Sequence, residues 1–335
     1  MEHNFFEYKD NFEKYKHIKS NLLVGDIENI SNPKITIAIP TYKRAHLITT
    51  SLNSAINQIK FENYEIIVVD NEASEEENKT EKLIKGYNNP KILYYKNKEN
   101  IGMFGNWNRC IELARGEYIT ILNDDDWLDK KFLFSVLKEI EEKKAIHTKI
   151  KIYDYREKKE KDLKNKIKTL LKISYTKISM IKKRREFSII DFFYSNRGNG
   201  SLGILFHKKS LFALGGYNEE FFPSSDYYLH ANYCQKYGAK LLKRNLGYYR
   251  IQENESMRIE TAKKWPIQGF ALRKYIIENF IENKNKYSFL NEIITEKFKK
   301  DIKRVWNISI PYDREKTAKK YAFKLVTREI IKNIF

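Results

Sequence analysis

Short apolar runs alternate with helical patterns through the first 130 residues of the chain. Four of these runs are apolar or β-branched enough to predict buried strands: ITIAI (35–39), EIIVV (65–69), KILYY (91–95) and YITIL (118–122). Between the first two runs, and again between the last two, apolar residues recur at the spacing of one helix face. This alternation predicts an α/β fold built on a mostly parallel, doubly wound sheet.

The pattern continues less regularly to the end of the chain. It predicts a helix at 129–143, strands at 148–155 and 202–206, a helix at 226–237 and a strand near 246–251. We also expect a helix before the first strand and helices throughout the chain beyond residue 261. The expected organisation is an N-terminal helical extension (1–33), an α/β domain (34–260) and a helical, basic C-terminal extension (261–335).

Unusual polar residues follow three of the predicted strands. The first strand ends in Pro40-Thr41-Tyr42-Lys43-Arg44, the second in Asp70-Asn71 and the fourth in Asn123-Asp124-Asp125-Asp126. In sheets of this kind, ligands bind outside the carboxyl ends of the strands, where the strand order reverses. The three endings therefore predict one site at a single edge of the sheet.

The acidic cluster at the end of the fourth strand predicts a cation. Three adjacent carboxylates raise one another's pKa unless a positive charge relieves the repulsion. Mg²⁺ and Mn²⁺ prefer oxygen ligands, and Mg²⁺ is often held by one or two carboxylates together with substrate phosphates. The alternative is an acidic turn that complements the dipole of the next helix.

A glycine-rich phosphate loop is missing from the sequence. There is no GxGxxG after the first predicted strand and no GxxxxGK[ST], so the sequence lacks both dinucleotide and P-loop signatures. A nucleotide would have to be held by side chains and a metal. Tyr42 could stack on its base and Asp70 or Asn71 could hydrogen-bond the base edge. Alternatively, Tyr42 is an ordinary aromatic wall, and the pair forms an N-cap or Asx-turn.

The net charge of +19 is concentrated in two segments. Residues 141–186 and residues 261–335 each carry +10, whereas the rest of the chain carries −1. Such segments predict an anionic partner, which could be nucleic acid, a membrane surface or a phosphorylated substrate. Alternatively, the lysines serve only solubility.

Other features of the composition favour a cytoplasmic protein. Two cysteines are too few for a disulfide framework, and the N-terminus lacks the apolar core of a signal peptide. No stretch approaches the roughly 18 apolar residues that a membrane span needs.

Three separated segments together resemble the inverting glycosyltransferases of family 2, which have the Rossmann-like GT-A fold. These are ITIAIPTYKRAHLITTSLNSAINQ, EIIVVDNEAS and NKENIGMFGNWNRCIELARGEYITILNDDDWL, and they cover residues 34–134. The resemblance implies metal-dependent transfer of a sugar from a nucleotide-sugar donor, preferentially a UDP-sugar, to a glycan acceptor. That acceptor would be lipid-linked or part of a cell-surface polysaccharide. Residues 34–134 would form the nucleotide-sugar half, and residues 135–260 the acceptor half with the basic insert 141–186.

The resemblance also assigns roles to individual residues. The donor would bind the residues that follow the first two strands: Pro40, Thr41, Tyr42, Arg44, Asp70 and Asn71. The wall beside the nucleotide would be formed by Asn100, Gly102, Asn106 and Asn108. In the acidic motif, Asn123 and Asp124 would face the ribose and diphosphate. Asp125 would bind Mn²⁺ or Mg²⁺, and Asp126 would support the motif and start the next helix.

A later segment, ALGGYNEEFFPSSDYYLH (213–230), resembles the family's segment that carries the catalytic base. The resemblance places that base at Asp226. An inverting transfer is a single displacement, which needs a base for the acceptor hydroxyl and a metal for the departing diphosphate. The alternative is that Asp226 is only the N-cap of a helix.

Three residues depart from the family pattern. Asn71 and Asn123 stand where many relatives carry acids, and Gln252 stands where relatives often carry a histidine that binds the metal. We therefore expect a loosely held metal that binds mainly together with the nucleotide sugar. The departures also leave open a catalytically impaired GT-A scaffold.

The basic C-terminal helices are expected to bind an anionic membrane surface at the inner face of the cell membrane. A nucleic-acid-binding protein is the main alternative, but no helix-turn-helix, RRM or zinc pattern accompanies the charge. We therefore expect no nucleic-acid partner. A nucleotidylyltransferase is a further alternative, and it would need glycines that PTYKRAH lacks.

Overall fold

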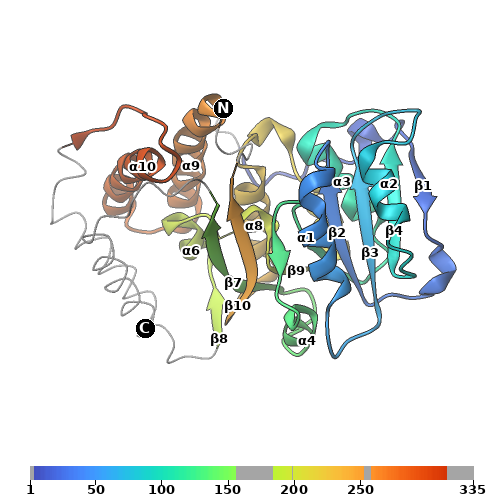
Figure 1. Cartoon of the computed structure of the whole chain (residues 1–335). Coiled ribbons are helices and arrows are strands. Elements are labelled where there is room, and N and C mark those ends of the chain that lie inside the picture. Colours follow the sequence, from blue (N-terminus) through green and yellow to red (C-terminus); the bar gives the residue numbers. More distant parts are fainter. Residues whose placement is uncertain (1–3, 156–183, 198, 253–257, 315–335) are drawn as a thin grey trace, which may run out of the picture.

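The computed structural model describes residues 4–155, 184–197, 199–252 and 258–314. These residues form one long mixed sheet with helices on both of its faces (Figure 1). Strand β1 lies at one end of the molecule, and helices α9 and α10 lie at the other.

The sheet runs in the order β1-β4-β3-β2-β5-β9-β7-β10-β6, and β8 also pairs with β10. Strands β4, β3, β2 and β5 are parallel, as are β7 and β10, and β9 joins the two groups by antiparallel pairing. The strands are β1 (Ser20–Val24), β2 (Ile35–Thr41), β3 (Tyr64–Asp70), β4 (Ile92–Asn97), β5 (Tyr118–Ile121), β6 (Trp127–Leu128), β7 (Ala145–Asp154), β8 (Arg184–Phe187), β9 (Ile204–His207) and β10 (Ala239–Ile251).

The helices divide between the two faces because alternate strand residues point in opposite directions. Ile67 and Val69 of β3 belong to one apolar cluster, with side chains of α3, α6 and α8. Ile66 and Val68 belong to the other, with side chains of α1, α2 and α4. The helices are α1 (Ala45–Ile56), α2 (Lys79–Lys85), α3 (Gly102–Leu113), α4 (Phe132–Leu137), α6 (Ile189–Tyr194), α7 (Lys208–Phe212), α8 (Ser225–Tyr237), α9 (Ile259–Phe280) and α10 (Lys284–Trp306).

The α/β fold class predicted from the sequence is confirmed, as are the four strands of the parallel group. The expected N-terminal helix is wrong. Residues Glu13–Tyr15 form only a 3₁₀ turn, and β1 pairs antiparallel with β4. Arg109 of α3 stabilises this arrangement, because its guanidinium donates to the carbonyls of Tyr15 (2.8 Å), in the 3₁₀ turn, and of Ile18 (2.7 Å), just before β1. The helix expected at 129–143 is shorter, since α4 spans only Phe132–Leu137.

Helices α9 and α10 pack into the body of the protein. Leu272 and Ile276 of α9 and Leu290 of α10 belong to the same apolar cluster as α3 and α8. The buried Arg273 holds the two helices together by donating to Asn291 (2.6 Å) and to Thr295 (2.7 Å). Within the described residues, no helix combines the length and apolar character needed to cross a bilayer. Most of the basic insert, residues 156–183, lies outside the described part of the chain.

Candidate active site

The three polar strand endings meet at one edge of the sheet. Thr41 at the end of β2 is paired with Asp70 at the end of β3. On the other side of β2, the Leu122 N–H donates to the Ala38 carbonyl (2.9 Å). The residues that follow β5 therefore lie at the same edge. The parallel order β3-β2-β5 therefore brings together Thr41, Asp70 and Asp124, which lie 29 to 83 positions apart in the sequence.

Arg44 and Thr41 hold the first two acids of the motif. The Thr41 hydroxyl donates to Asp124 Oδ2 at 2.8 Å. Arg44 Nη1 donates to Asp124 Oδ1 at 3.1 Å and to Asp125 Oδ2 at 3.0 Å. A single guanidinium nitrogen thus bridges the two carboxylates, both of which are buried.

Asp126 binds different partners from the other two acids. Its Oδ1 accepts from the Arg250 backbone N–H (3.0 Å), and its Oδ2 accepts from Asn123 Nδ2 (3.0 Å). The antiparallel pairing of β10 with β6 brings Arg250 here, and its guanidinium lies 5.4 Å from the centre of the Trp127 ring. The three acids are therefore not equivalent, because Asp126 ties the motif to β10.

The pKa values of the three acids are raised, mainly by burial, despite the charge of Arg44. Burial, together with the neighbouring charge of Asp125, raises the pKa of Asp124 to about 6, although Arg44 opposes the shift. Burial also raises the pKa of Asp125 and, more strongly, that of Asp126. Among the described residues, no three His, Cys, Asp or Glu side chains are grouped to hold a metal by themselves. Two hard oxygen donors fit a divalent cation that completes its coordination with a ligand's phosphates.

Asn71 belongs to a network of side-chain amides. Its Nδ2 donates to Asn100 Oδ1 (2.7 Å) and to the Gly102 carbonyl (3.2 Å), and its Oδ1 accepts from Asn97 Nδ2 (3.0 Å). Asn97 also donates to Asn106 (2.9 Å). These bonds fix the loop between β4 and α3 against the end of β3.

Asp70 is fully buried, and its carboxylate is held by protein groups. It accepts from the Tyr94 hydroxyl (2.7 Å), from Asn78 Nδ2 (2.9 Å) and from the Glu72 backbone N–H (2.9 Å). Tyr42, in contrast, is 43% exposed beside the site, whereas Pro40 is buried within β2. Of these residues, only Tyr42 presents an open surface to a base.

Asn108 lies on α3 and binds the backbone of Tyr217. Its Nδ2 donates to the Tyr217 carbonyl (2.8 Å), and its Oδ1 accepts from the Tyr217 N–H (2.7 Å). The neighbouring Gly216 has φ +74°, and a Cβ there would lie 2.5 Å from Asn108 Oδ1. Asn108 therefore anchors the loop that leads to α8.

Asp226 lies in the first turn of α8, where Ser224 and not Asp226 is the N-cap. Its Oδ2 accepts from Asn196 Nδ2 (3.0 Å) and from the Gly200 N–H (3.2 Å). Burial raises the pKa of Asp226, and these two hydrogen bonds oppose the shift. A buried carboxylate with a raised pKa suits a general base.

Gly200, which was not predicted from the sequence, connects the acidic motif to Asp226. Its carbonyl accepts from Asn123 Nδ2 (3.2 Å), while its N–H donates to Asp226. Its backbone has φ +64°, a conformation that favours glycine. The only available signal was the glycine pair in RGNGS (197–201), which indicates a turn but not its partners.

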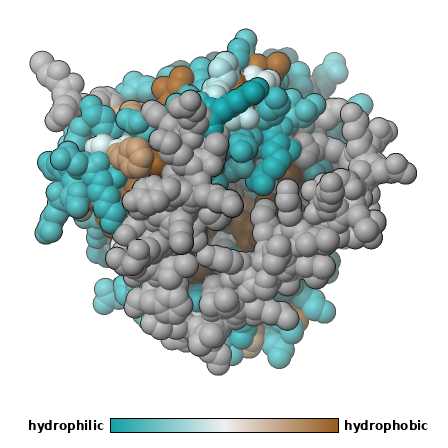
Figure 2. Space-filling model, turned by 90° about the vertical axis from the view of Figure 1, so that its left-hand side faces the viewer, coloured by the Kyte–Doolittle hydropathy of each residue, from teal (hydrophilic) through white to brown (hydrophobic). Residues whose placement is uncertain are grey.

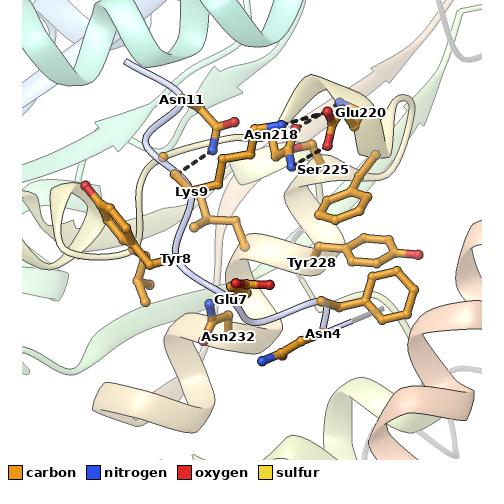
Figure 3. Close-up of a pocket in the computed structure, with 15 residues that line it drawn as sticks. Asn4, Glu7, Tyr8, Lys9, Asn11, Asn218, Glu220, Ser225, Tyr228 and Asn232 are labelled. Atoms are coloured by element: carbon orange, nitrogen blue, oxygen red, sulfur yellow. Dashed lines mark hydrogen bonds and ion pairs between the residues drawn. The ribbon is translucent and has the colours of Figure 1, made fainter. Parts of the chain in front are cut away.

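A cavity of about 340 Å³ lies along a different side of α8. The cavity is lined by the N-terminal segment, including Lys9 and Asn11, and by Ser225, Tyr228 and Asn232 of α8 (Figure 3). Lys9 forms an ion pair with Glu220 (2.7 Å), and Asn11 Nδ2 donates to the Gly215 carbonyl (3.0 Å). The N-terminal segment therefore fastens the loop that precedes the Asp226 helix.

The segment that contains the edge site matches a known family model. Residues 36–199 match the model described as glycosyl transferase family 2. This segment belongs to glycosyltransferase family 2. A relative from Campylobacter jejuni, GalNAc(5)-diNAcBac-PP-undecaprenol beta-1,3-glucosyltransferase, is 31% identical over 113 residues, which cover 33% of this chain and 35% of the relative. The chain spans 34 to 42% of the length of the first curated relatives that it matches.

Solved glycosyltransferases share the fold over most of the chain. Residues 1–349 of TarS from S. aureus, in complex with UDP-GlcNAc, superpose with a TM-score of 0.55 at 17% identity, over 81% of this chain and 73% of that TarS fragment. The mannosyltransferase PcManGT from Pyrobaculum calidifontis, in complex with GDP-Man and Mn²⁺, gives a TM-score of 0.51 at 14% identity, over 96% and 86% of the two chains. The GT-A fold expected from the sequence is confirmed by these similarities.

Proposed function

We propose that the protein is a metal-dependent inverting glycosyltransferase that transfers a sugar from a nucleotide-sugar donor to a glycan acceptor. The observation that carries this proposal is the connection through Gly200, which links the acidic motif of the segment that matches family 2 to the buried carboxylate of Asp226. A UDP-sugar is the first donor to test, because the TarS structure similar to this chain contains UDP-GlcNAc.

The acidic motif would hold the metal together with the donor. Asp125, with Asp124 beside it, would supply the hard oxygen ligands. The PcManGT structure, which shares the fold, contains both GDP-Man and Mn²⁺. A bound Mn²⁺ or Mg²⁺ would offset the charge of the departing diphosphate. Tyr42 offers its exposed ring to the base of the nucleotide. Asp70 and Asn71 would act mainly by fixing the loops around the base, given that their polar atoms are engaged within the protein.

Asp226 would accept the proton of the acceptor hydroxyl as the sugar is transferred. Its raised pKa makes the carboxylate a stronger base than an exposed aspartate. Asn196 and Gly200 both donate to Oδ2 and therefore orient the carboxylate at the end of α8. Since Gly200 also binds Asn123, donor binding and base position would depend on the same loop.

A donor panel tests the proposal. UDP-, GDP- and dTDP-sugars are added with and without Mn²⁺, and thermal unfolding and donor hydrolysis are measured. A donor present at 100 times its Kd stabilises the folded state by about 2.7 kcal/mol, which raises the Tm by a few degrees. If no nucleotide sugar stabilises the protein or is hydrolysed with Mn²⁺ present, the proposed function is wrong.

The pH profile of turnover should depend on Asn196. The hydrogen bond from Asn196 lowers the pKa of Asp226, so Asn196→Ala should raise that pKa further. The base is then protonated at higher pH, and the acidic limb of the kcat profile moves to higher pH. At pH values on that limb, kcat should fall by about tenfold or more, because a hydrogen bond to a charged group contributes about 1.5–3 kcal/mol. A uniform loss of kcat at every pH would indicate a structural effect only.

An anionic membrane surface would bring the enzyme to a lipid-linked acceptor. Helix α9 presents an outer face formed by Ile259, Lys263, Ile267, Phe270 and Lys274, all of which are exposed. The side chains of Ile259 and Ile267 are 56% and 69% exposed. Figure 2 shows that the described residues on this side of the molecule are mainly hydrophilic, with a few hydrophobic residues among them. Apolar side chains interleaved with lysines suit the interface of an anionic bilayer.

Polar substitution of this outer face should weaken binding to vesicles. Ile267→Gln with Phe270→Gln removes two apolar side chains that would enter the interface, and each buried apolar side chain contributes about 1.5–3 kcal/mol. Co-sedimentation with phosphatidylglycerol-containing vesicles should therefore fall by about tenfold or more. Ile152→Gln, which changes a 62% exposed side chain on β7, is the matched control. Equal binding of the double variant and the control would disprove the membrane contact. Deleting α9 is a poorer test because the helix is part of the core.

A further inference from the structure

Arg44 stands where a divalent cation would bind in the proposed function. Its Nη1 lies 3.1 Å from Asp124 Oδ1 and 3.0 Å from Asp125 Oδ2. The guanidinium side chain is 29% exposed, whereas each of the two acidic side chains is 7% exposed. Arg44 is thus the partly solvated member of a buried charge cluster, which makes it the member that can move most readily.

Arg44 and a divalent cation would compete for the same two carboxylates. Asp124 already uses both oxygens, one with Arg44 and the other with Thr41. Asp125 uses one oxygen with Arg44. A divalent cation on these oxygens would also lie within a few ångströms of the guanidinium charge, where like charges repel strongly at low dielectric.

A nucleotide diphosphate removes this conflict. Arginine binds phosphate oxygens through a fork of N–H donors, so a diphosphate offers Arg44 a replacement for the two carboxylates. The acids are then released to the metal, which would bind the same diphosphate.

We propose that Arg44 is a positioning residue that makes metal binding conditional on the nucleotide. In the free protein it acts as an internal counter-ion of Asp124 and Asp125 and excludes the divalent cation. When the donor binds, the guanidinium transfers to the diphosphate and the acids accept the metal. The site thereby avoids holding a metal without its substrate. This inference rests on the proposed function.

Binding of Mn²⁺ to Arg44→Gln tests the inference without any turnover. The Kd for Mn²⁺ is measured by electron paramagnetic resonance, with and without UDP, in both proteins. The free natural protein should bind Mn²⁺ weakly, and UDP should tighten binding by roughly 5–150-fold, the range of typical coupling between sites. In Arg44→Gln, the free protein should bind Mn²⁺ more tightly, and the effect of UDP should shrink to a few-fold. Equal or weaker binding of Mn²⁺ by the free variant would overturn the inference.

Control variants distinguish the counter-ion role of Arg44 from a general effect of positive charge and from an effect on folding. Lys43→Gln removes a neighbouring exposed charge whose ammonium lies over the Tyr42 ring, and it should change the Kd for Mn²⁺ in the free protein by less than about twofold. The shift in Tm caused by Mn²⁺ alone should be larger in Arg44→Gln than in the natural protein, because the variant leaves two buried acids without their cation. Arg44→Lys, which keeps the charge, should lie between the two. A Tm shift that is equal in all of these proteins would refute the role.

The outcome for the natural protein separates this inference from the proposed function. If the natural protein does not bind UDP with Mn²⁺ present, the proposed function fails whatever Arg44 does. If the natural protein shows the coupling and Arg44→Gln keeps it unchanged, the proposed function stands and the inference fails.

Discussion

Asp226→Asn should lower kcat by about 10²–10⁴-fold while the affinity for the nucleotide-sugar donor changes less than about twofold. The amide has the size of the carboxylate, and its oxygen can still accept from Asn196 and Gly200. It cannot accept the proton of the acceptor hydroxyl, and a positioned base contributes 10²–10⁴-fold to a rate. Donor turnover in the presence of acceptor gives kcat, and calorimetry with Mn²⁺ and a UDP-sugar gives the donor affinity.

Glu220→Gln is the matched control for Asp226→Asn. It makes the same acid-to-amide change six residues earlier, at a side chain whose ion pair with Lys9 is exposed. Its kcat should stay within about twofold of the natural protein, because exposed ion pairs contribute about 0–1 kcal/mol. A kcat of Asp226→Asn that matches this control would exclude Asp226 as the base. A parallel loss of donor affinity would show that the residue supports the donor site instead.

The parallel part of the sheet and the edge that carries the site could be predicted from local patterns. Runs such as ITIAI and EIIVV are apolar on both faces, as strands between two helical layers must be. The polar residues that follow them then meet at one edge, because parallel strands share their carboxyl ends. The convergence of Thr41, Asp70 and Asp124 could therefore be predicted without any knowledge of side-chain contacts.

The contacts between distant segments could not be predicted in this way. Arg109 binds two carbonyls that lie about 90 positions earlier, just before β1, and β1 pairs with β4 where the local pattern of the N-terminus predicted a helix. Gly200 meets Asn123 and Asp226 across 77 and 26 positions. A one-dimensional pattern shows that a glycine or an amide is present, but it does not show which group that residue will bind.

The sequence also did not show that side chains near the base-binding loops would be hydrogen-bonded within the protein. Asp70 and Asn71 carry the groups that could read a base, and the sequence therefore suggested direct contacts. In the structure their oxygens and nitrogens bind Tyr94, Asn97 and Asn100. Burial, which depends on the whole fold, decides whether such a group is available to a ligand or holds a loop.

Asp125→Asn should abolish the stabilisation of the protein by donor and Mn²⁺, with a loss of metal-dependent donor affinity of more than about 100-fold. Loss of a group that merely supports a metal ligand already costs 10–100-fold in affinity, and Asp125 is the proposed ligand itself. The free variant should not be less stable, because the substitution removes a charge that raises the pKa of buried Asp124. Asp129→Asn makes the same change four residues later and keeps the oxygen that accepts from the Lys131 N–H (2.8 Å), so it should retain the full response to the donor. Differential scanning fluorimetry with Mn²⁺ and a UDP-sugar measures both effects. A donor response of Asp125→Asn equal to that of Asp129→Asn would remove Asp125 from the metal site and move the proposed ligand to Asp124, the other acid that Arg44 binds.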